Sequence, residues 1–177
     1  MHEDVILEEE RIAREREADA ERLGAAILRE PIREVATLQS AVCVAPSATV
    51  REAIECMKEN EVGYVLIQDQ GRLVGIFTER DVLMKIVLQG HDIDELRVET
   101  VMTPDPEALS PDDRVSYALN KMSVGGFRHI PLVDSDGCPV GAVSMRNVVD
   151  FMVDLFAPAV LTLPPQPGNM PSAREGA

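Results

Sequence analysis

The sequence predicts an α+β fold made of two repeats of one α/β-type unit, related by pseudo-two-fold symmetry. Residues 50–57, VREAIECM, resemble residues 115–122, VSYALNKM, so Val115 stands 65 residues after Val50. Residues 66–83, LIQDQGRLVGIFTERDVL, resemble residues 132–149, LVDSDGCPVGAVSMRNVV, at an offset of 66 residues. The helical and extended patterns also follow one another in the same order in both copies. The central part of the chain is therefore read as an internal duplication.

Each unit is expected to begin with an amphipathic helix. In the first copy, Thr49 and Glu52 have the spacing of a capping box, in which a hydroxyl and a carboxylate satisfy free backbone donors. In the second copy, Asp113 is expected to take the capping position. Apolar residues then recur at helical spacing, with Ala53, Ile54 and Met57 in the first copy and Ala118, Leu119 and Met122 in the second.

Two strands and a closing helix are expected after this first helix. The apolar runs YVLIQD and HIPLVD end at turn signals made of Asp and Gly, and the runs LVGIF and PVGAV come next. With a short extended lead-in, each unit becomes a three-stranded sheet with two packed helices. One face of such a sheet stays apolar and exposed when the unit is alone, so the two copies should pack together. The closing helices should present Val82, Leu83, Ile86 and Val87, or Val148, Val149, Met152 and Val153, on one face.

The chain divides into four predicted parts, with a charged helical lead-in at 1–31, a first repeat at 32–95, a second repeat at 96–157 and a disordered tail at 158–177. The lead-in mixes Glu and Arg densely, and charged residues interrupt its apolar positions. This pattern favours an exposed helix or a partly disordered segment over a coiled-coil arm. The tail is rich in Pro and Gly, which disfavours a packed core.

Composition disfavours several classes of partner and location. The formal net charge of -14 at pH 7 disfavours a nucleic-acid partner, because a phosphate backbone requires a basic surface. The N-terminus lacks the regions of a signal peptide, and charge or proline breaks the longest apolar segments, so no membrane span is expected. Cys43, Cys56 and Cys138 lack the spacing of metal ligands and are expected to be buried structural thiols in a reducing, cytoplasmic setting.

The stretch GIFTERD, residues 75–81, supports two interpretations. Thr78 and Asp81 have capping-box spacing, which satisfies backbone donors at a helix start and requires no ligand. The same geometry can bind a phosphate or a sugar. The second copy reads GAVSMRN, in which Ser144 keeps the hydroxyl and Asn147 replaces the carboxylate.

The repeated unit resembles the cystathionine-beta-synthase (CBS) domain, and the tandem pair resembles a Bateman module. The resemblance is carried by GIFTERDVL and its counterpart in the second copy, by VMTPDPEALSPDDRV at the start of the second copy, and by RHIPLVD within it. It implies a non-catalytic regulatory module that binds AMP, ADP, ATP or S-adenosylmethionine in clefts between the copies. It also implies a homodimer and a regulated partner protein, which the sequence does not identify.

By this resemblance, one good ligand site is expected around Thr78 and Asp81. Thr78 would contact phosphate or ribose, and Asp81 would accept hydrogen bonds from both ribose hydroxyls, which a carboxylate does better than an amide. The remaining implied contacts are Arg128 and His129 with phosphate, and Ile76 and Thr103 with adenine. Arg80 could also reach phosphate, but a surface position at the helix start is favoured for it.

The second cleft is expected to be weak or empty. Asn147 lacks the carboxylate, and the first-copy counterpart of Arg128 and His129 lies near Tyr64, in VGY, which has no cation. A phosphate in this cleft would lack a charge-assisted hydrogen bond worth ~1.5–3 kcal/mol. Together with Ser144, Asn147 and Tyr64 define the weaker site.

The sequence contains no recognisable catalytic set. Its three histidines, His2, His91 and His129, are scattered, and no nucleophile motif or metal-ligand spacing accompanies them. A ligand-binding module is therefore favoured. Two alternatives remain, a ligand-free module that serves only in assembly or dimerisation and an enzyme that hydrolyses a nucleotide.

Overall fold

The computed structural model describes residues 11, 24–25, 27–36 and 41–155. The predicted tail and most of the predicted lead-in lie outside these residues. The elements are, in chain order, helix α2 (Ile32–Val35), strand β1 (Cys43–Val44), helix α3 (Val50–Glu59), strands β2 (Tyr64–Asp69) and β3 (Arg72–Thr78), helix α4 (Glu79–Asp81), π-helix η1 (Val82–Ile86), 3-10 helix η2 (Val98–Thr100), strand β4 (Thr103–Pro104), helix α5 (Val115–Gly125), strands β5 (His129–Val133) and β6 (Pro139–Ser144), and helix α6 (Met145–Leu155).

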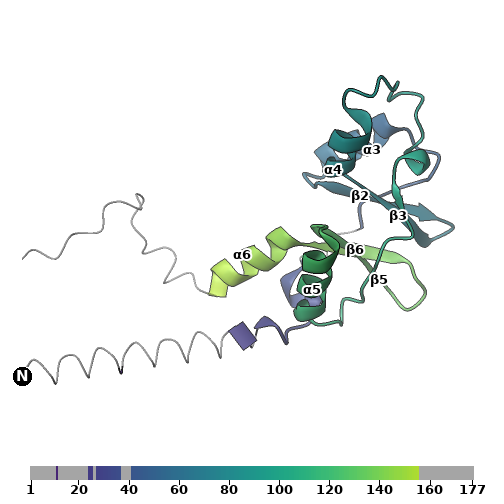
Figure 1. Ribbon diagram of the computed structural model, residues 1–177. Coiled ribbons are helices and arrows are strands. Elements are labelled where there is room, and N and C mark those ends of the chain that lie inside the picture. Colours follow the sequence, from purple (N-terminus) through teal and green to yellow (C-terminus); the bar gives the residue numbers. More distant parts are fainter. Residues whose placement is uncertain (1–10, 12–23, 26, 37–40, 156–177) are drawn as a thin grey trace, which may run out of the picture.

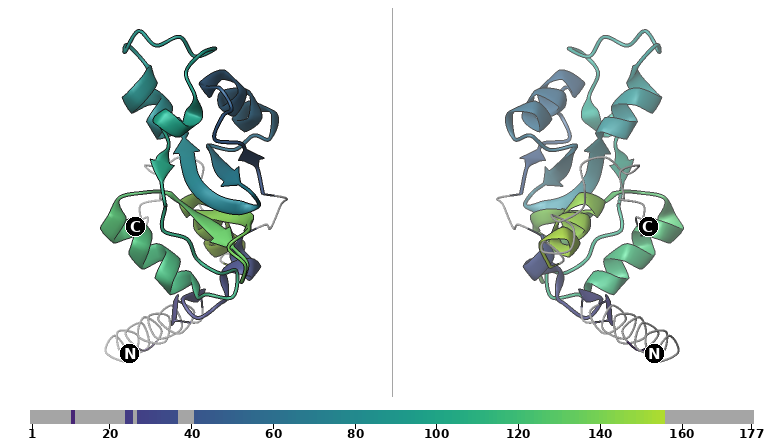
Figure 2. Two further views of the ribbon diagram at one scale, coloured as in Figure 1. Left: turned by 90° about the vertical axis from the view of Figure 1, so that its right-hand side faces the viewer. Right: turned by 90° about the vertical axis from the view of Figure 1, so that its left-hand side faces the viewer.

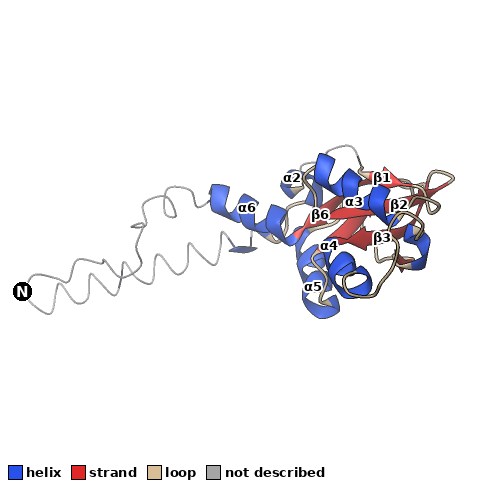
Figure 3. Ribbon diagram, turned by 90° about the horizontal axis from the view of Figure 1, so that it is seen from above, coloured by secondary structure: helices blue, strands red, loops and turns tan. Residues whose placement is uncertain are grey.

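Two copies of one unit make up the described fold, and they confirm the predicted α+β class (Figures 1 and 3). In the first unit, β1 pairs in parallel with β2, and β2 pairs antiparallel with β3. In the second unit, β5 pairs antiparallel with β6, and Leu109 adds an isolated parallel bridge to Leu132. The bridge at Leu109 occupies the place that β1 takes in the first unit.

The number of strands differs from the three predicted for each unit. The first sheet has four strands, because β4 from the lead-in of the second copy pairs antiparallel with β3. Gly75 lies opposite Pro104, and Ile76 lies opposite Thr103. Pro104 has no backbone N–H to donate, which suits it to the edge of a sheet. The second sheet has two strands among the described residues.

Each hydrophobic core includes the segment that precedes the other unit. Ile32, Val35 and Ala36 come before the first unit, yet they pack into the core of α5, β5, β6 and α6. Figures 1 and 2 show this purple segment beside the second unit. Val98 and Val101 come before the second unit and pack into the core of α3, β2 and β3. The repeats in the sequence and the packed units of the fold are therefore interleaved.

The two units meet through the far faces of their sheets. Val65 and Ile67 point from β2 into the first core, so Leu66 between them points to the opposite face. Leu66 is nevertheless fully buried. The β5–β6 hairpin lies against this face in Figure 1, and Leu73 N donates to Gly137 O of the hairpin turn at 3.1 Å. The end of β3 is thereby brought close to the second unit.

The predicted helix caps are correct in one copy and wrong in the other. Thr49 and Glu52 form the capping box before α3, with Thr49 N donating to Glu52 Oε2 at 2.7 Å. The residue at the start of α5 is Arg114, which makes no capping side-chain bond. Asp113 instead accepts a hydrogen bond from Ser110 N at 2.8 Å. Asp113 stands one position too early to be the counterpart of Thr49, so its carboxylate closes the preceding turn.

The closing helix of the first unit is less regular than predicted. It consists of the short α4 and then the π-helix η1, whereas α6 in the second unit is a continuous α-helix. Ile86 is buried, but Leu83 is 64% exposed, so the predicted apolar face does not pack entirely within the chain. In α6, Val148 is buried and Val149 is 49% exposed. Each closing helix therefore divides its apolar side chains between the core and the surface.

Ile32→Ala is expected to lower the free energy of unfolding by about 2–5 kcal/mol, because truncating a fully buried aliphatic side chain leaves a cavity. The damage should fall on the second core. Urea unfolding measures the free energy, and hydrogen exchange should accelerate more in β5 and β6 than in β2 and β3. Val124→Ala, at a position that is 82% exposed, serves as the control. A larger acceleration in β2 and β3 would contradict the crossed packing.

Candidate ligand-binding site

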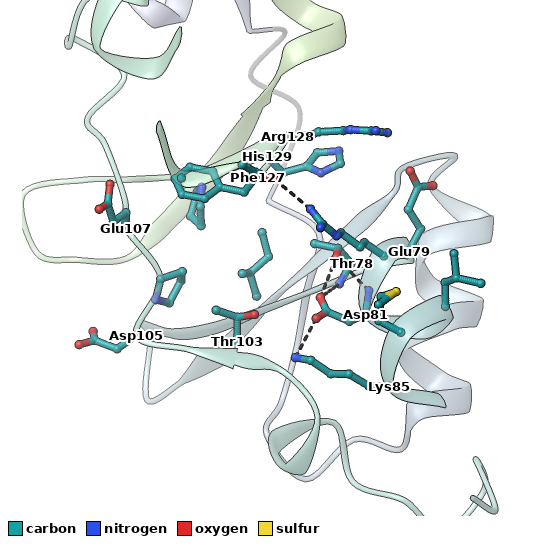
Figure 4. A pocket seen from close by; sticks show the side chains of 18 residues that line it. Thr78, Glu79, Asp81, Lys85, Thr103, Asp105, Glu107, Phe127, Arg128 and His129 are labelled. Carbon is teal, nitrogen blue, oxygen red and sulfur yellow. Dashed lines mark hydrogen bonds and ion pairs between the residues drawn. The ribbon is translucent and has the colours of Figure 1, made fainter. Parts of the chain in front are cut away.

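A cavity of about 1030 Å³ lies between the two units, at the upper end of the range for small-molecule sites. Residues of β3, α4 and η1 form one wall, and the junction of α5 and β5 forms another (Figure 4). Residues of β4 and of the chain after it lie between these walls. The structure brings together all the residues predicted for the main site, namely Ile76, Thr78, Arg80, Asp81, Thr103, Arg128 and His129.

Thr78 and Asp81 form a capping box at the end of β3. Thr78 N and Thr78 Oγ1 donate to Asp81 Oδ2 at 2.9 and 2.6 Å, and Asp81 N donates to Thr78 Oγ1 at 3.3 Å. The capping interpretation of this stretch is therefore confirmed. Because the cap uses only one carboxylate oxygen, Oδ1 is left for other partners.

Lys85 is a charged residue of the cavity that the sequence prediction did not include. Its Nζ pairs with Asp81 Oδ1 at 2.8 Å and donates to the carbonyl oxygens of Val101 and Met102 at 2.7 and 3.4 Å. These carbonyls directly precede Thr103 in β4. The sequence signal that could have identified Lys85 is its position four residues after Asp81. At this spacing an acid and a base lie on the same face of a helix. Lys85 thus joins the carboxylate to the neighbouring wall (Figure 4).

The hydrogen-bonding capacity of Asp81 is largely used. A carboxylate has about four lone-pair positions, two on each oxygen. Thr78 fills both positions on Oδ2, and Lys85 fills one on Oδ1, so one position remains open. Asp81 can therefore accept from two ligand hydroxyls only if the Thr78 hydroxyl proton turns away from Oδ2. An acceptor on the ligand, close to Thr78, would provide a new partner for that proton.

Arg80 connects the two units. Its Nη1 donates to Gly126 O at 2.9 Å, and Gly126 ends α5 in a left-handed conformation with φ +68°. Arg80 is exposed, as the favoured surface expectation has it, but its guanidinium binds a carbonyl and not only solvent. Its guanidinium contributes to the cavity wall and also satisfies a carbonyl at a helix end.

His129 is a weaker base in the folded protein than a free histidine is. Burial lowers the pKa of His129 below its ordinary value of 6.5, Glu79 opposes this shift, and Arg128 reinforces it. The imidazole can therefore offer a hydrogen bond but not a full charge. Its ring lies 5.3 Å from the ring of Tyr64. Within the predicted basic pair, Arg128 therefore supplies most of the positive charge and His129 supplies mainly a hydrogen-bonding group.

Acidic side chains are as prominent in the cavity as basic ones. Glu107 is paired outside the cavity with Lys121 at 2.6 Å. Two of the cations, Lys85 and Arg80, already have partners within the protein. A ligand with several negative charges would therefore rely mainly on Arg128. The charged lining consists of Glu79, Asp81, Asp105 and Glu107 against Arg80, Lys85 and Arg128.

A second cavity, of about 990 Å³, contains Tyr64, Ser144 and Asn147, the three residues of the predicted weaker site. Asn147 Oδ1 accepts from Ser144 N and Ser144 Oγ at 2.8 and 2.6 Å. This is the cap of the first copy with an amide in place of the carboxylate. The cap itself therefore does not require a charged group.

The expectation that a phosphate in the second cleft would meet no cation is wrong. Lys58, Arg128 and Arg146 line this cavity, together with Glu61 and Glu79. Arg128 borders both cavities because the start of β5 lies between them. The comparison of the two repeats assigned each basic residue to a single cleft. It therefore did not predict that Arg128 lines both cavities.

Other reactive groups are sparse in the described part of the chain. Within these ranges no three His, Cys, Asp or Glu side chains are grouped as a metal site, and no helix has the length and apolar character needed to cross a bilayer. The cysteines are free thiols and are only partly buried, not fully buried as expected. Burial, together with the nearby Cys56, raises the pKa of Cys43 to about 11, so this thiol stays protonated at neutral pH.

Comparison with known proteins identifies the repeated unit. The CBS domain family model matches residues 32–88 and 98–154. An uncharacterized 17.7 kDa protein of Acidianus ambivalens is 38% identical over 125 residues, which cover 70% of this chain and 74% of that protein. The CBS domain-containing protein CBSCBSPB3 of Arabidopsis thaliana is 34% identical over 112 residues, covering 63% of this chain but 20% of that protein. The structure of a Pyrobaculum aerophilum CBS domain protein complexed with AMP is similar, with 26% identity, a TM-score of 0.64 and coverage of 74% of this chain and 99% of that one.

Stability is expected to fall as the pH drops below about 6.5, partly because of His129. Its pKa is lowered in the folded protein, so the unfolded chain binds a proton at a higher pH than the folded chain does. The stability that the neutral His129 contributes is fully present above its pKa in the unfolded chain. This stability is lost as the pH falls towards its pKa in the folded protein. Urea unfolding at about pH 7.5 and about pH 5.5 measures this loss in the wild type and in His129→Gln.

The His129→Gln variant should lose less stability than the wild type over this interval. His91→Gln, which changes an exposed histidine, is the matched control and should behave as the wild type does. An equal loss in the wild type and His129→Gln would contradict the role assigned to burial of His129.

Proposed function

This chain belongs to the CBS domain family as a tandem pair, and we propose that it is a non-catalytic regulatory module that binds an adenosine-containing ligand between its two units. The ligand class comprises AMP, ADP, ATP and S-adenosylmethionine, and bound ligand modulates a partner protein. One observation carries the proposal. In the first cavity, Thr78 and Asp81 of the first unit lie across from Arg128 and His129 of the second.

The hydrogen-bond groups of the cavity match a ribose 5′-phosphate. A phosphate oxygen beside Thr78 accepts its hydroxyl proton, which frees one lone pair on Asp81 Oδ2. Together with the open position on Oδ1, the carboxylate then has one acceptor position on each oxygen. These two positions suit the two adjacent hydroxyls of a ribose, so phosphate binding at Thr78 and ribose binding at Asp81 support each other.

The adenine ring is assigned to the apolar part of the same cavity. Ile76 is 7% exposed, and Phe127 lines the wall that belongs to the second unit. Thr103 pairs with Ile76 across the β3–β4 ladder and adds backbone polar groups at the edge of this slot. An apolar slot with a few polar groups at its rim is typical of sites for planar heterocycles.

A ligand that carries few negative charges fits this cavity best. Its four carboxylates face three cations, two of which are already engaged within the protein. AMP therefore fits the charge of the lining better than ATP does. The AMP complex of the related Pyrobaculum aerophilum protein supports this choice.

The regulatory step follows from the position of the cavity between two units. A ligand that contacts Asp81 on one side and Arg128 on the other favours the arrangement in which both are within reach. Occupancy therefore selects one relative orientation of the units and changes the surface offered to a partner. The alternative is a ligand-free assembly module, in which the Thr78–Asp81 cap is purely structural.

Thermal unfolding with AMP, ADP, ATP and S-adenosylmethionine tests ligand binding. A ligand that binds only the folded protein should raise its stability by about 2.7 kcal/mol at a hundredfold excess over Kd, with AMP effective at lower concentration than ATP. Asp81→Ala should abolish this shift, because the ribose acceptor is removed. A well-folded sample that responds to none of these compounds would favour the assembly alternative.

Asn147→Ala provides the matched control for this experiment. It removes the corresponding cap of the second unit, so both variants should lose about 1 kcal/mol of stability without ligand. Only Asp81→Ala should also lose the ligand-dependent shift of the first cavity. A shift that survives unchanged in Asp81→Ala would overturn the site assignment.

We propose further that the module is a homodimer. Leu83 and Met84 of η1 are 64% and 65% exposed, and Met152 and Val153 of α6 are 40% and 39% exposed. Leu83 and Met84 also line the first cavity, whereas exposed apolar side chains such as those of α6 are typical of surfaces that a partner covers. Light scattering at micromolar concentration should give twice the chain mass, and Val153→Glu, at a side chain that lines neither cavity, should shift the protein towards the monomer. A wild-type monomer at that concentration would contradict the proposal.

A further inference from the structure

Lys85 makes more contacts than a surface ion pair requires. An ammonium group has three N–H donors, and Lys85 has three acceptors, Asp81 Oδ1 and the carbonyl oxygens of Val101 and Met102. All of its donors are therefore engaged within the protein. Lys85 has no free donor for a ligand phosphate, although it lines the cavity.

The second copy offers an internal comparison for this ion pair. At the offset of 66 residues, Asn147 corresponds to Asp81 and Phe151 corresponds to Lys85, so both charged groups are absent together. Phe151 packs against the second core instead. The cap at Ser144 is nevertheless complete with the amide of Asn147. Capping therefore does not require the Asp81–Lys85 pair.

We propose that Lys85 is a positioning residue of the adenosine site, which orients the Asp81 carboxylate for the ribose hydroxyls. The inference rests on the function proposed above. Thr78 N holds Oδ2, and Lys85 holds Oδ1, so the plane of the carboxylate is fixed from both ends. Once the Thr78 hydroxyl proton has turned from Oδ2 to a ligand phosphate, each oxygen keeps one lone pair that can point into the cavity.

Lys85 also fixes the distance between the two halves of the ligand site. Its contacts with the carbonyls of Val101 and Met102 hold the chain that leads into Thr103, at the edge of the adenine slot. Asp81 binds the ribose in the same scheme. One ammonium group therefore ties the sugar acceptor to the strand beside the base, as the dashed contact between Lys85 and Asp81 illustrates (Figure 4).

The test is discrimination between ribose and deoxyribose ligands. Calorimetry measures the affinity of adenosine, AMP and their 2′-deoxy counterparts for the wild type, Lys85→Met and Lys85→Arg. The wild type should prefer the ribose forms by about tenfold, the effect of one hydrogen bond to a charged acceptor. In Lys85→Met this preference should fall below about threefold. Lys85→Arg keeps the charge and the donors and should retain most of it.

A purely structural role predicts a different result. It would weaken ribose and deoxyribose ligands by the same factor in Lys85→Met and leave their ratio unchanged, which would overturn the proposal. Arg51→Met removes a cation of a surface ion pair with Asp94, outside both cavities, and should leave the ratio at the wild-type value. Urea unfolding verifies that each variant is folded, and Lys85→Gln replaces Lys85→Met in the comparison if the latter is not.

The failure of this inference can be told apart from the failure of the proposed function. If the wild type binds none of the four compounds, the proposed function falls and the role of Lys85 falls with it. If the wild type binds and prefers ribose, but Lys85→Met keeps the full preference, only the role of Lys85 is overturned. A wild type that binds ribose and deoxyribose forms equally also overturns it.

Discussion

The exchange of lead-in segments between the two units is the constraint on which the cavity depends. Ile32 and Val35 complete the second core, and Val98 and Val101 complete the first, so neither unit can separate without exposing apolar surface of both. The second lead-in continues directly into β4, which pairs with β3 along the cavity wall. The same crossing that stabilises the fold therefore holds the ligand site together.

Local chemistry made much of the site predictable from sequence. The duplicated pattern fixed the order of the elements, and the spacing of Thr78 and Asp81 predicted a cap that the structure contains. Cap spacing is a property of four consecutive residues, so it does not depend on how distant segments pack. The remaining predicted residues came from a resemblance between whole repeats. They line one cavity because they follow from the shared architecture of the repeats.

The features that could not be predicted all depend on contacts between distant segments. The apolar character of Ile32 predicts that this side chain is buried. It does not predict which of the two similar cores contains it. The two-residue strand β4 is too short to give a periodic signal. The lowered pKa of His129 is a consequence of burial, which arises only after both units are assembled. Arg128 was assigned to one cleft because a comparison of the two repeats does not show which residues lie between the clefts.

The position of Arg128 on the border of both cavities has a consequence for how the protein responds to concentration. One guanidinium cannot serve phosphates in both cavities at full strength, so a ligand that draws it to one side weakens binding on the other. Thermodynamic linkage makes this penalty equal in both directions. Two sites that oppose each other fill over a wider range of ligand concentration than two independent ones. Under the function proposed above, a shared cation would give the pair a graded response in place of a sharp threshold.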